Sequence, residues 1–89
     1  MECLAAELAS SGILVNEIAP GIVDAGLSGN LMARHRGHRE RTRKKIPIRR
    51  LLTADDVARG IVTLCHPDNC HMTGSVMLLD GGLTLRGPI

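Results

Sequence analysis

The chain has 89 residues, no Phe, Tyr or Trp, and a formal net charge of +2, so it is at most one small domain with an aliphatic core. The missing aromatic rings remove the base-stacking platforms of most single-stranded nucleic-acid binders, and no apolar run approaches the roughly 20 residues that a membrane-spanning helix needs. Three cysteines, an odd number, and the lack of a signal-like beginning favour the reducing cytoplasm over a secreted disulfide scaffold.

A helix and a strand are the first two elements expected along the chain. Four apolar residues at helical spacing line one face of the helix: Met1, Leu4, Ala5 and Leu8. With Gly12 at a position typical of a C-terminal cap, residues 1–11 are predicted to be helical. Residues 13–19 are rich in branched side chains and closed by a Pro-Gly pair, which predicts a strand. Asn16 and Glu17 within it are interpreted as loop-anchoring and surface residues, not as catalysts.

A long connection is expected over residues 20–52, with a short helix within 27–33 and a basic lid-like loop over 26–45. The run from Arg34 to Lys45 holds five Arg and two Lys against Glu40 alone. Such a run can bind the phosphates of nucleic acid, an acidic partner or a phosphorylated substrate. The chain has neither aromatic residues nor a known nucleic-acid module, so the favoured interpretation is a solvated lid.

A second helix and a second strand close the predicted order of helix, strand, loop, helix and strand. Thr53 and Asp56 form a capping-box pattern, and apolar residues at helical spacing continue to Leu64. Residues 75–79 are predicted to be a strand, and residues 80–82, Asp-Gly-Gly, are interpreted as a structural turn. Two strands joined by a crossover helix form a right-handed parallel unit that normally lies inside a larger sheet. The predicted fold class is therefore α/β.

Two Cys-His pairs lie close together near the end of this helix. They supply four soft ligands within seven residues: Cys65, His66, Cys70 and His71. A zinc site would use such ligands in a reducing compartment, but adjacent residues point in different directions and the spacing is poor for it. No metal site is predicted.

Several segments, in their order and spacing, resemble the short-chain dehydrogenase/reductases, and in particular their 3-oxoacyl-(acyl-carrier-protein) reductase-like members. The segments are residues 12–21 (GILVNEIAPG), 46–50 (IPIRR), 55–58 (DDVA) and 73–82, which begin Thr-Gly and end Asp-Gly-Gly. The resemblance covers nearly the whole chain and corresponds to the last third of that family's domain. It implies that residues 1–89 are the C-terminal portion of such a domain, a fragment of a Rossmann-like parallel sheet without the N-terminal dinucleotide-binding half.

The resemblance also implies a cofactor site, for NAD or NADP, at Pro20, Gly21, Ile22 and Val23. In the family, the Pro-Gly loop closes over the nicotinamide half of the cofactor, and the residue after the glycine offers backbone atoms to the carboxamide. Proline fixes the direction of the chain there, while glycine lets the backbone approach a flat ring closely. Family members usually carry a cofactor-binding threonine four positions after that glycine, where this chain has Ala25.

Two parts of the family's machinery have no counterpart in these 89 residues: the glycine-rich phosphate loop and the Ser, Tyr and Lys that exchange the substrate's proton. We therefore expect a truncated chain that is inactive alone, from a family that oxidises or reduces small hydroxyl and carbonyl compounds with NAD or NADP. The alternatives are a non-catalytic module that pairs with a full-length relative or as a homo-oligomer, and anion or nucleic-acid binding through Arg34 to Lys45. The first strand should have an open edge, which favours partial disorder, aggregation or a partner.

Overall fold

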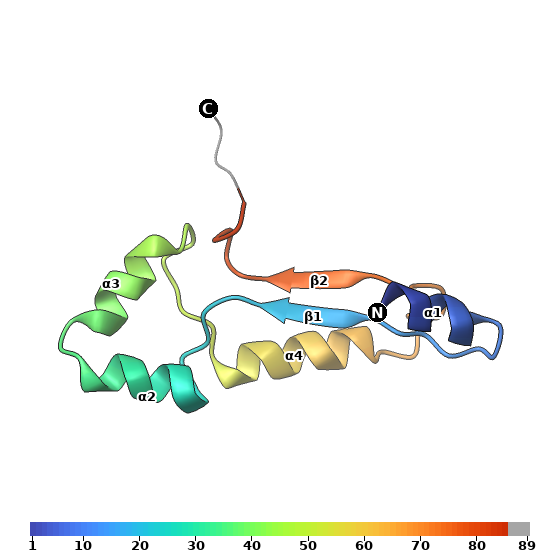
Figure 1. Cartoon of the computed structure of the whole chain (residues 1–89), viewed down its shortest axis with the longest axis horizontal. Helices are drawn as coiled ribbons and strands as arrows, with labels where there is room; N and C mark the ends of the chain where they lie inside the picture. The colour runs from blue at the N-terminus through green and yellow to red at the C-terminus, as the bar shows by residue number, and fades with distance from the viewer. Residues whose placement is uncertain (86–89) are drawn as a thin grey trace.

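The computed structural model describes residues 1–85 and has an α/β architecture (Figure 1). Its elements, in chain order, are α1 (Glu2–Ala9), β1 (Glu17–Pro20), α2 (Gly26–Arg34), α3 (His38–Lys45), α4 (Ala54–Leu64) and β2 (Val76–Leu79). The two strands are parallel neighbours, with Glu17 opposite Val76 and Pro20 opposite Leu79. Figure 1 shows α4 running along the strands, α1 near their amino ends, and α2 and α3 beyond their carboxyl ends. The predicted fold class is confirmed, and so are the two predicted strands and the helices predicted at α1, α2 and α4.

β1 is shorter than predicted, because side-chain hydrogen bonds hold the chain ahead of it. The backbone N–H of Val15 donates to the Thr73 hydroxyl at 3.1 Å, a bond that the regular ladder would not make. The Asn16 amide donates to the Met72 carbonyl at 3.0 Å and accepts from the Ser75 N–H at 3.0 Å. These bonds confirm that Asn16 anchors a loop, and regular pairing begins only at Glu17.

α4 begins at the capping box that the sequence predicts. The Thr53 hydroxyl accepts from the Asp56 N–H at 3.1 Å, and the Asp56 carboxylate accepts from the Thr53 N–H at 2.9 Å. The hydrogen bond from the Thr53 N–H, aided by the Thr53 side chain and by the charge of Arg50, lowers the pKa of Asp56. Gly60 is buried on the sheet side of the helix, where an added Cβ would lie 2.7 Å from Leu79 Cδ1. Glycine thus allows α4 to lie close to the strands.

Residues 26–45, expected as a loop with one short helix, form a helical hairpin instead. The helix predicted within 27–33 is present as α2, but the loop expected after it is wrong, because residues 38–45 form α3. The two helices meet at Gly37, whose φ of 75° suits a residue without a Cβ. The sequence of α3, HRERTRKK, has no apolar periodicity from which a helix could be predicted. Its role as a lid stays a prediction.

The buried core lies where the hairpin meets the carboxyl ends of the strands. Met32, Ile46 and Leu51 form a buried cluster, against which the half-buried Ile22 and Leu83 pack. Large apolar side chains elsewhere in the chain are exposed, among them Leu4, Ile13, Leu14, Ile61, Val62, Val76 and Leu78. The accessible surface is 6704 Å², whereas a compact monomer of this mass exposes about 5,000 Å². The chain therefore leaves on the order of 1,000 Å² or more of extra surface uncovered.

None of the helices within residues 1–85 is both long enough and apolar enough to cross a membrane.

Candidate functional site

Residues 20–25 leave the carboxyl end of β1 and lead into α2, and their first turn is held against the end of β2. The Gly21 N–H donates to the Leu79 carbonyl at 2.8 Å. A Cβ on Gly21 would lie 2.8 Å from Asp80 Cβ and 2.9 Å from Asp80 Cα, too close for any larger residue without a backbone shift. The close approach of Asp80 therefore requires a glycine at position 21 even when no ligand is present. The sequence alone did not indicate this reason for the glycine.

The next residues pair with the segment that precedes α4. The Leu52 N–H donates to the Ile22 carbonyl at 3.2 Å, and the Asp24 N–H donates to the Leu52 carbonyl at 2.8 Å. These two bonds leave the backbone N–H groups of Ile22 and Val23 without a hydrogen bond to any of residues 1–85. Both residues are half-buried. The carboxyl end of β1 thus offers two adjacent free donors in a partly covered position.

An ion pair connects the hairpin to this segment. The Asp24 carboxylate accepts two hydrogen bonds from Arg39 of α3, one donated by Nε and one by Nη2, each at 2.8 Å. The hydrogen bonds to Asp24 raise the pKa of the Arg39 guanidinium. Because the pair is exposed to solvent, its main effect is to orient α3 rather than to stabilise the fold.

Ala25 is the N-cap residue of α2 and provides no side-chain cap. Its methyl group cannot supply the hydrogen bond that a threonine would offer there, either to the helix or to a ligand. Of the residues 20–25, only the backbone groups and the Asp24 carboxylate are polar.

The turn that follows β2 is built around a buried carboxylate. Asp80 is 6% exposed and accepts from the Gly82 N–H and the Thr84 N–H, each at 3.0 Å, and from the Thr84 hydroxyl. The bond from the Thr84 hydroxyl, aided by those from the backbone, lowers the pKa of Asp80. Since its carboxylate is used within the turn, the interpretation of residues 80–82 as structural is confirmed.

The two Cys-His pairs do not converge on a metal position. His66 Nδ1 accepts a hydrogen bond from the Asp68 N–H at 3.1 Å, which forms a local turn. Within residues 1–85, no three His, Cys, Asp or Glu side chains are placed to hold a metal ion.

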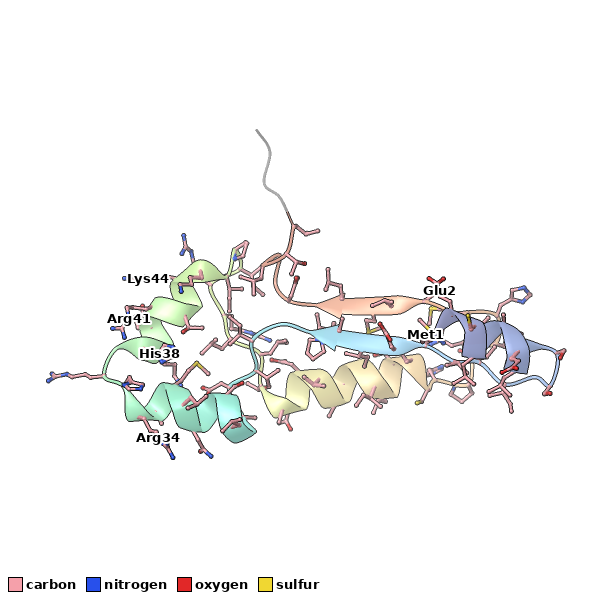
Figure 2. The ribbon with its side chains drawn as sticks, in the orientation of Figure 1. Met1, Glu2, Arg34, His38, Arg41 and Lys44 are labelled. Carbon is pink, nitrogen blue, oxygen red and sulfur yellow. The ribbon has the colours of Figure 1, made fainter. Side chains whose placement is uncertain are left out.

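The basic run is spread over the surface of the hairpin. Arg39 pairs with Asp24 and Arg43 pairs with Glu40, while Figure 2 shows Arg41 and Lys44 on the outer side of α3. Another side of α3, which carries Thr42, lines a small pocket between α3 and α2. The sequence did not indicate this pocket. Only the i, i+4 and i+7 spacing of His38, Thr42 and Lys45 could have suggested it, once a helix was assumed there.

Parallel strands joined by a crossover helix, with free donors at their carboxyl ends, define part of a Rossmann-like α/β domain. The family model described as enoyl-(acyl carrier protein) reductase matches residues 1–84. The chain belongs to the short-chain dehydrogenase/reductase family.

Similar proteins include reductases and dehydrogenases from bacteria. A 3-oxoacyl-(acyl-carrier-protein) reductase of Buchnera aphidicola is 36% identical over 80 residues, which cover 90% of this chain and 31% of the relative. Glucose 1-dehydrogenase 2 of Bacillus subtilis is 33% identical over 84 residues, or 94% of this chain and 32% of the relative. The chain thus spans about a third of the length of the curated relatives that it matches.

Solved structures give the same result. A short-chain dehydrogenase family protein from Francisella tularensis superposes with a TM-score of 0.87 at 28% identity, covering 96% of this chain and 38% of that protein. ElxO with NADP bound has a TM-score of 0.84 at 32% identity, covering 96% of this chain and 34% of ElxO.

Proposed function

We propose that this chain forms the nicotinamide-side part of an oxidoreductase that uses NAD or NADP to interconvert small hydroxyl and carbonyl compounds. The observation that carries the proposal is the pair of free backbone N–H groups at Ile22 and Val23, at the carboxyl end of a parallel strand. An amide oxygen, such as that of a nicotinamide carboxamide, accepts hydrogen bonds from donors of this kind. The similarity to ElxO, which was solved with NADP bound, supports this choice of cofactor class.

Each residue of the segment would have its own part in binding. Pro20 sets the direction in which the chain leaves β1, and Gly21 keeps the segment against Asp80. Ile22 and Val23 donate from the backbone, and the Asp24 carboxylate holds α3 in place through Arg39. Ala25 gives the cofactor no hydroxyl contact, so the backbone donors carry the polar recognition on this side.

When bound, a reduced nicotinamide supplies a hydride to the carbonyl carbon, and a proton added to the oxygen completes the alcohol. These 89 residues contain no tyrosine that could give this proton. We therefore propose that the polypeptide is inactive by itself and contributes to an active site only together with the rest of a family domain.

A chimera tests this proposal. The 80 residues of the Buchnera reductase that align with this chain are replaced by it, and NADPH and NADH are titrated and assayed with a carbonyl substrate. We expect a cofactor dissociation constant within about tenfold of that of the parent reductase, measurable turnover in the chimera, and neither in the 89-residue chain alone. A folded chimera that binds neither cofactor would refute the proposal, as would turnover by the chain alone.

A second candidate function, that of a pairing module, is favoured by the uncovered surface. The excess on the order of 1,000 Å² is comparable with the roughly 800 Å² that each partner buries in a standard protein interface. Exposed apolar residues lie on α1, α4 and β2 and in the segment that precedes β1. The outer edge of β1 has no neighbouring strand within residues 1–85.

The pairing proposal predicts that the chain does not persist as a monomer. Size-exclusion chromatography with light scattering should show a homo-oligomer, or a complex when a full-length relative is present. The midpoint of thermal unfolding should also rise with protein concentration, because association stabilises only the folded chain. A monomer with a sharp, concentration-independent transition, and no binding to the relative, would contradict it.

We propose the cytoplasm as the place of action. The thiols of Cys3, Cys65 and Cys70 are free and exposed, a state that persists in a reducing compartment.

A further inference from the structure

A small pocket opens between α2, α3 and the segment that follows β1. Its volume is about 310 Å³, near the lower end of the range of roughly 300–1,000 Å³ for small-molecule sites. Ile22, Leu31 and Met32 give it an apolar floor. Ile22 connects the two sites, because its side chain lines this pocket while its backbone N–H is one of the two free donors.

The polar part of the lining comes from one face of α3 and from Ser28 of α2. His38, Thr42 and Lys45 follow one another at intervals of four and three residues, which places them on the same side of the helix. Figure 2 shows His38 between the two helices, whereas Arg41 and Lys44 extend from the outer side of α3. The charge of α3 is thus divided between an outer surface and the pocket, where Lys45 carries the formal positive charge.

Thr42 brings to the pocket a hydroxyl group that has no partner in the described part of the chain. The residue is only 8% exposed, yet its hydroxyl makes no hydrogen bond with any other side chain or backbone group among residues 1–85. Among the described residues, no side-chain polar atom is both sealed from solvent and without a hydrogen bond. The Thr42 hydroxyl is therefore open to solvent, and Thr42 lines the pocket. A deeply placed hydroxyl without a partner is costly unless water or a ligand completes its hydrogen bonding.

We infer that this pocket binds an organic acid, with a carboxylate on a short aliphatic chain, as the substrate side of the proposed oxidoreductase. The carboxylate pairs with Lys45 and accepts from the Thr42 hydroxyl, with the His38 ring beside them. The aliphatic chain lies on Ile22, Leu31 and Met32. The inference rests on the proposed function only where it calls the acid a substrate, since binding of the acid needs no cofactor.

The charges available in the pocket favour a monoanion. A phosphate monoester would require further cations, and the nearby Arg39 and Arg43 are already paired with Asp24 and Glu40. The single ammonium group of Lys45, with the hydroxyl groups of Thr42 and Ser28 as further donors, suits the two oxygens of one carboxylate.

The test is a titration of the ¹⁵N-labelled 89-residue chain with sodium hexanoate, followed by the amide shifts, with hexan-1-ol as the uncharged comparison. Hexanoate should shift the amides of α2, α3 and Ile22 in a saturable way, and hexan-1-ol should bind at least about tenfold more weakly. No saturable shift, shifts confined to other elements, equal binding of the alcohol, or a spectrum without a folded hairpin would each overturn the inference. Because no cofactor is present, these failures would leave the oxidoreductase proposal to its own test.

Three variants separate the pocket from the general basic charge of α3. Lys45→Met should weaken hexanoate binding about tenfold, and Thr42→Val, which keeps the shape but removes the hydroxyl, about fivefold. Lys44→Met removes the same charge one residue away, on the outer side, and should leave binding unchanged. Equal losses in Lys44→Met and Lys45→Met would show a diffuse attraction to the helix and refute the site.

Discussion

Gly21→Ala is expected to lower the affinity of the chimera for NADP⁺ by at least about tenfold and to destabilise the fold by about 1–3 kcal/mol. The added Cβ would lie 2.8 Å and 2.9 Å from the Cβ and Cα of Asp80. Because the obstacle is the Asp80 backbone and not a rotatable side chain, the segment after β1 must move away from β2. That movement displaces the N–H groups of Ile22 and Val23. A cofactor titration and urea unfolding measure the two effects.

Gly60→Ala is the matched control for this substitution. It adds the same methyl group to a buried glycine, but the first atom in its way is Leu79 Cδ1 at 2.7 Å, the end of a flexible side chain. Alanine also favours the helical backbone by about 1 kcal/mol, which offsets the displaced methyl group. The cofactor affinity should stay within about twofold. Similar losses in both variants would mean that general crowding, and not the position of the segment, controls binding.

Ile46→Ala is expected to remove about 2–4 kcal/mol of the free energy of unfolding. Ile46 is 2% exposed and belongs to the cluster with Met32 and Leu51 that joins the hairpin to the rest of the chain. Its loss would open a cavity there and reduce the helical signal at 222 nm as the hairpin loosens. Urea unfolding at one fixed chain concentration checks this, because association also contributes to stability.

Ile48→Ala, two residues further along, is its control. That side chain is 64% exposed, and the substitution should cost less than about 1 kcal/mol. If the two variants were equally stable, the cluster around Ile46 would not be the structural core of this chain.

The elements predicted from the sequence are those in which capping residues and apolar spacing agree with the face that is buried in the structure. In α4 the capping box and the apolar spacing indicate the same start and the same buried face, and the structure has both. The start of β1 could not be predicted, since it depends on hydrogen bonds between Asn16 and a segment more than fifty residues away. α3 was missed because all its residues are charged or polar, and its one buried side chain, Thr42, belongs to no apolar pattern.

For the candidate site, the family resemblance indicated which residues to consider, and the structure showed which contacts hold them in place. Residues 20–23 were expected to bind the cofactor from the Pro-Gly motif alone, and this assignment stays a prediction. The contact between Gly21 and Asp80, the Asp24–Arg39 pair and the pocket under α3 all join parts of the chain that are distant in sequence. No local pattern encodes such contacts, and they appear only when the tertiary arrangement is known.

The central claim is that the backbone of Ile22 and Val23 receives the nicotinamide side of the cofactor. Its most direct test is a titration of the ¹⁵N-labelled chimera with NADP⁺, in which these two amide signals are followed. Each of the two N–H groups should form a new hydrogen bond, which moves its signal downfield. The amide signal of Lys44, on the outer side of α3, should not shift. If NADP⁺ bound to the chimera and left the Ile22 and Val23 amides unshifted, the claim would be contradicted.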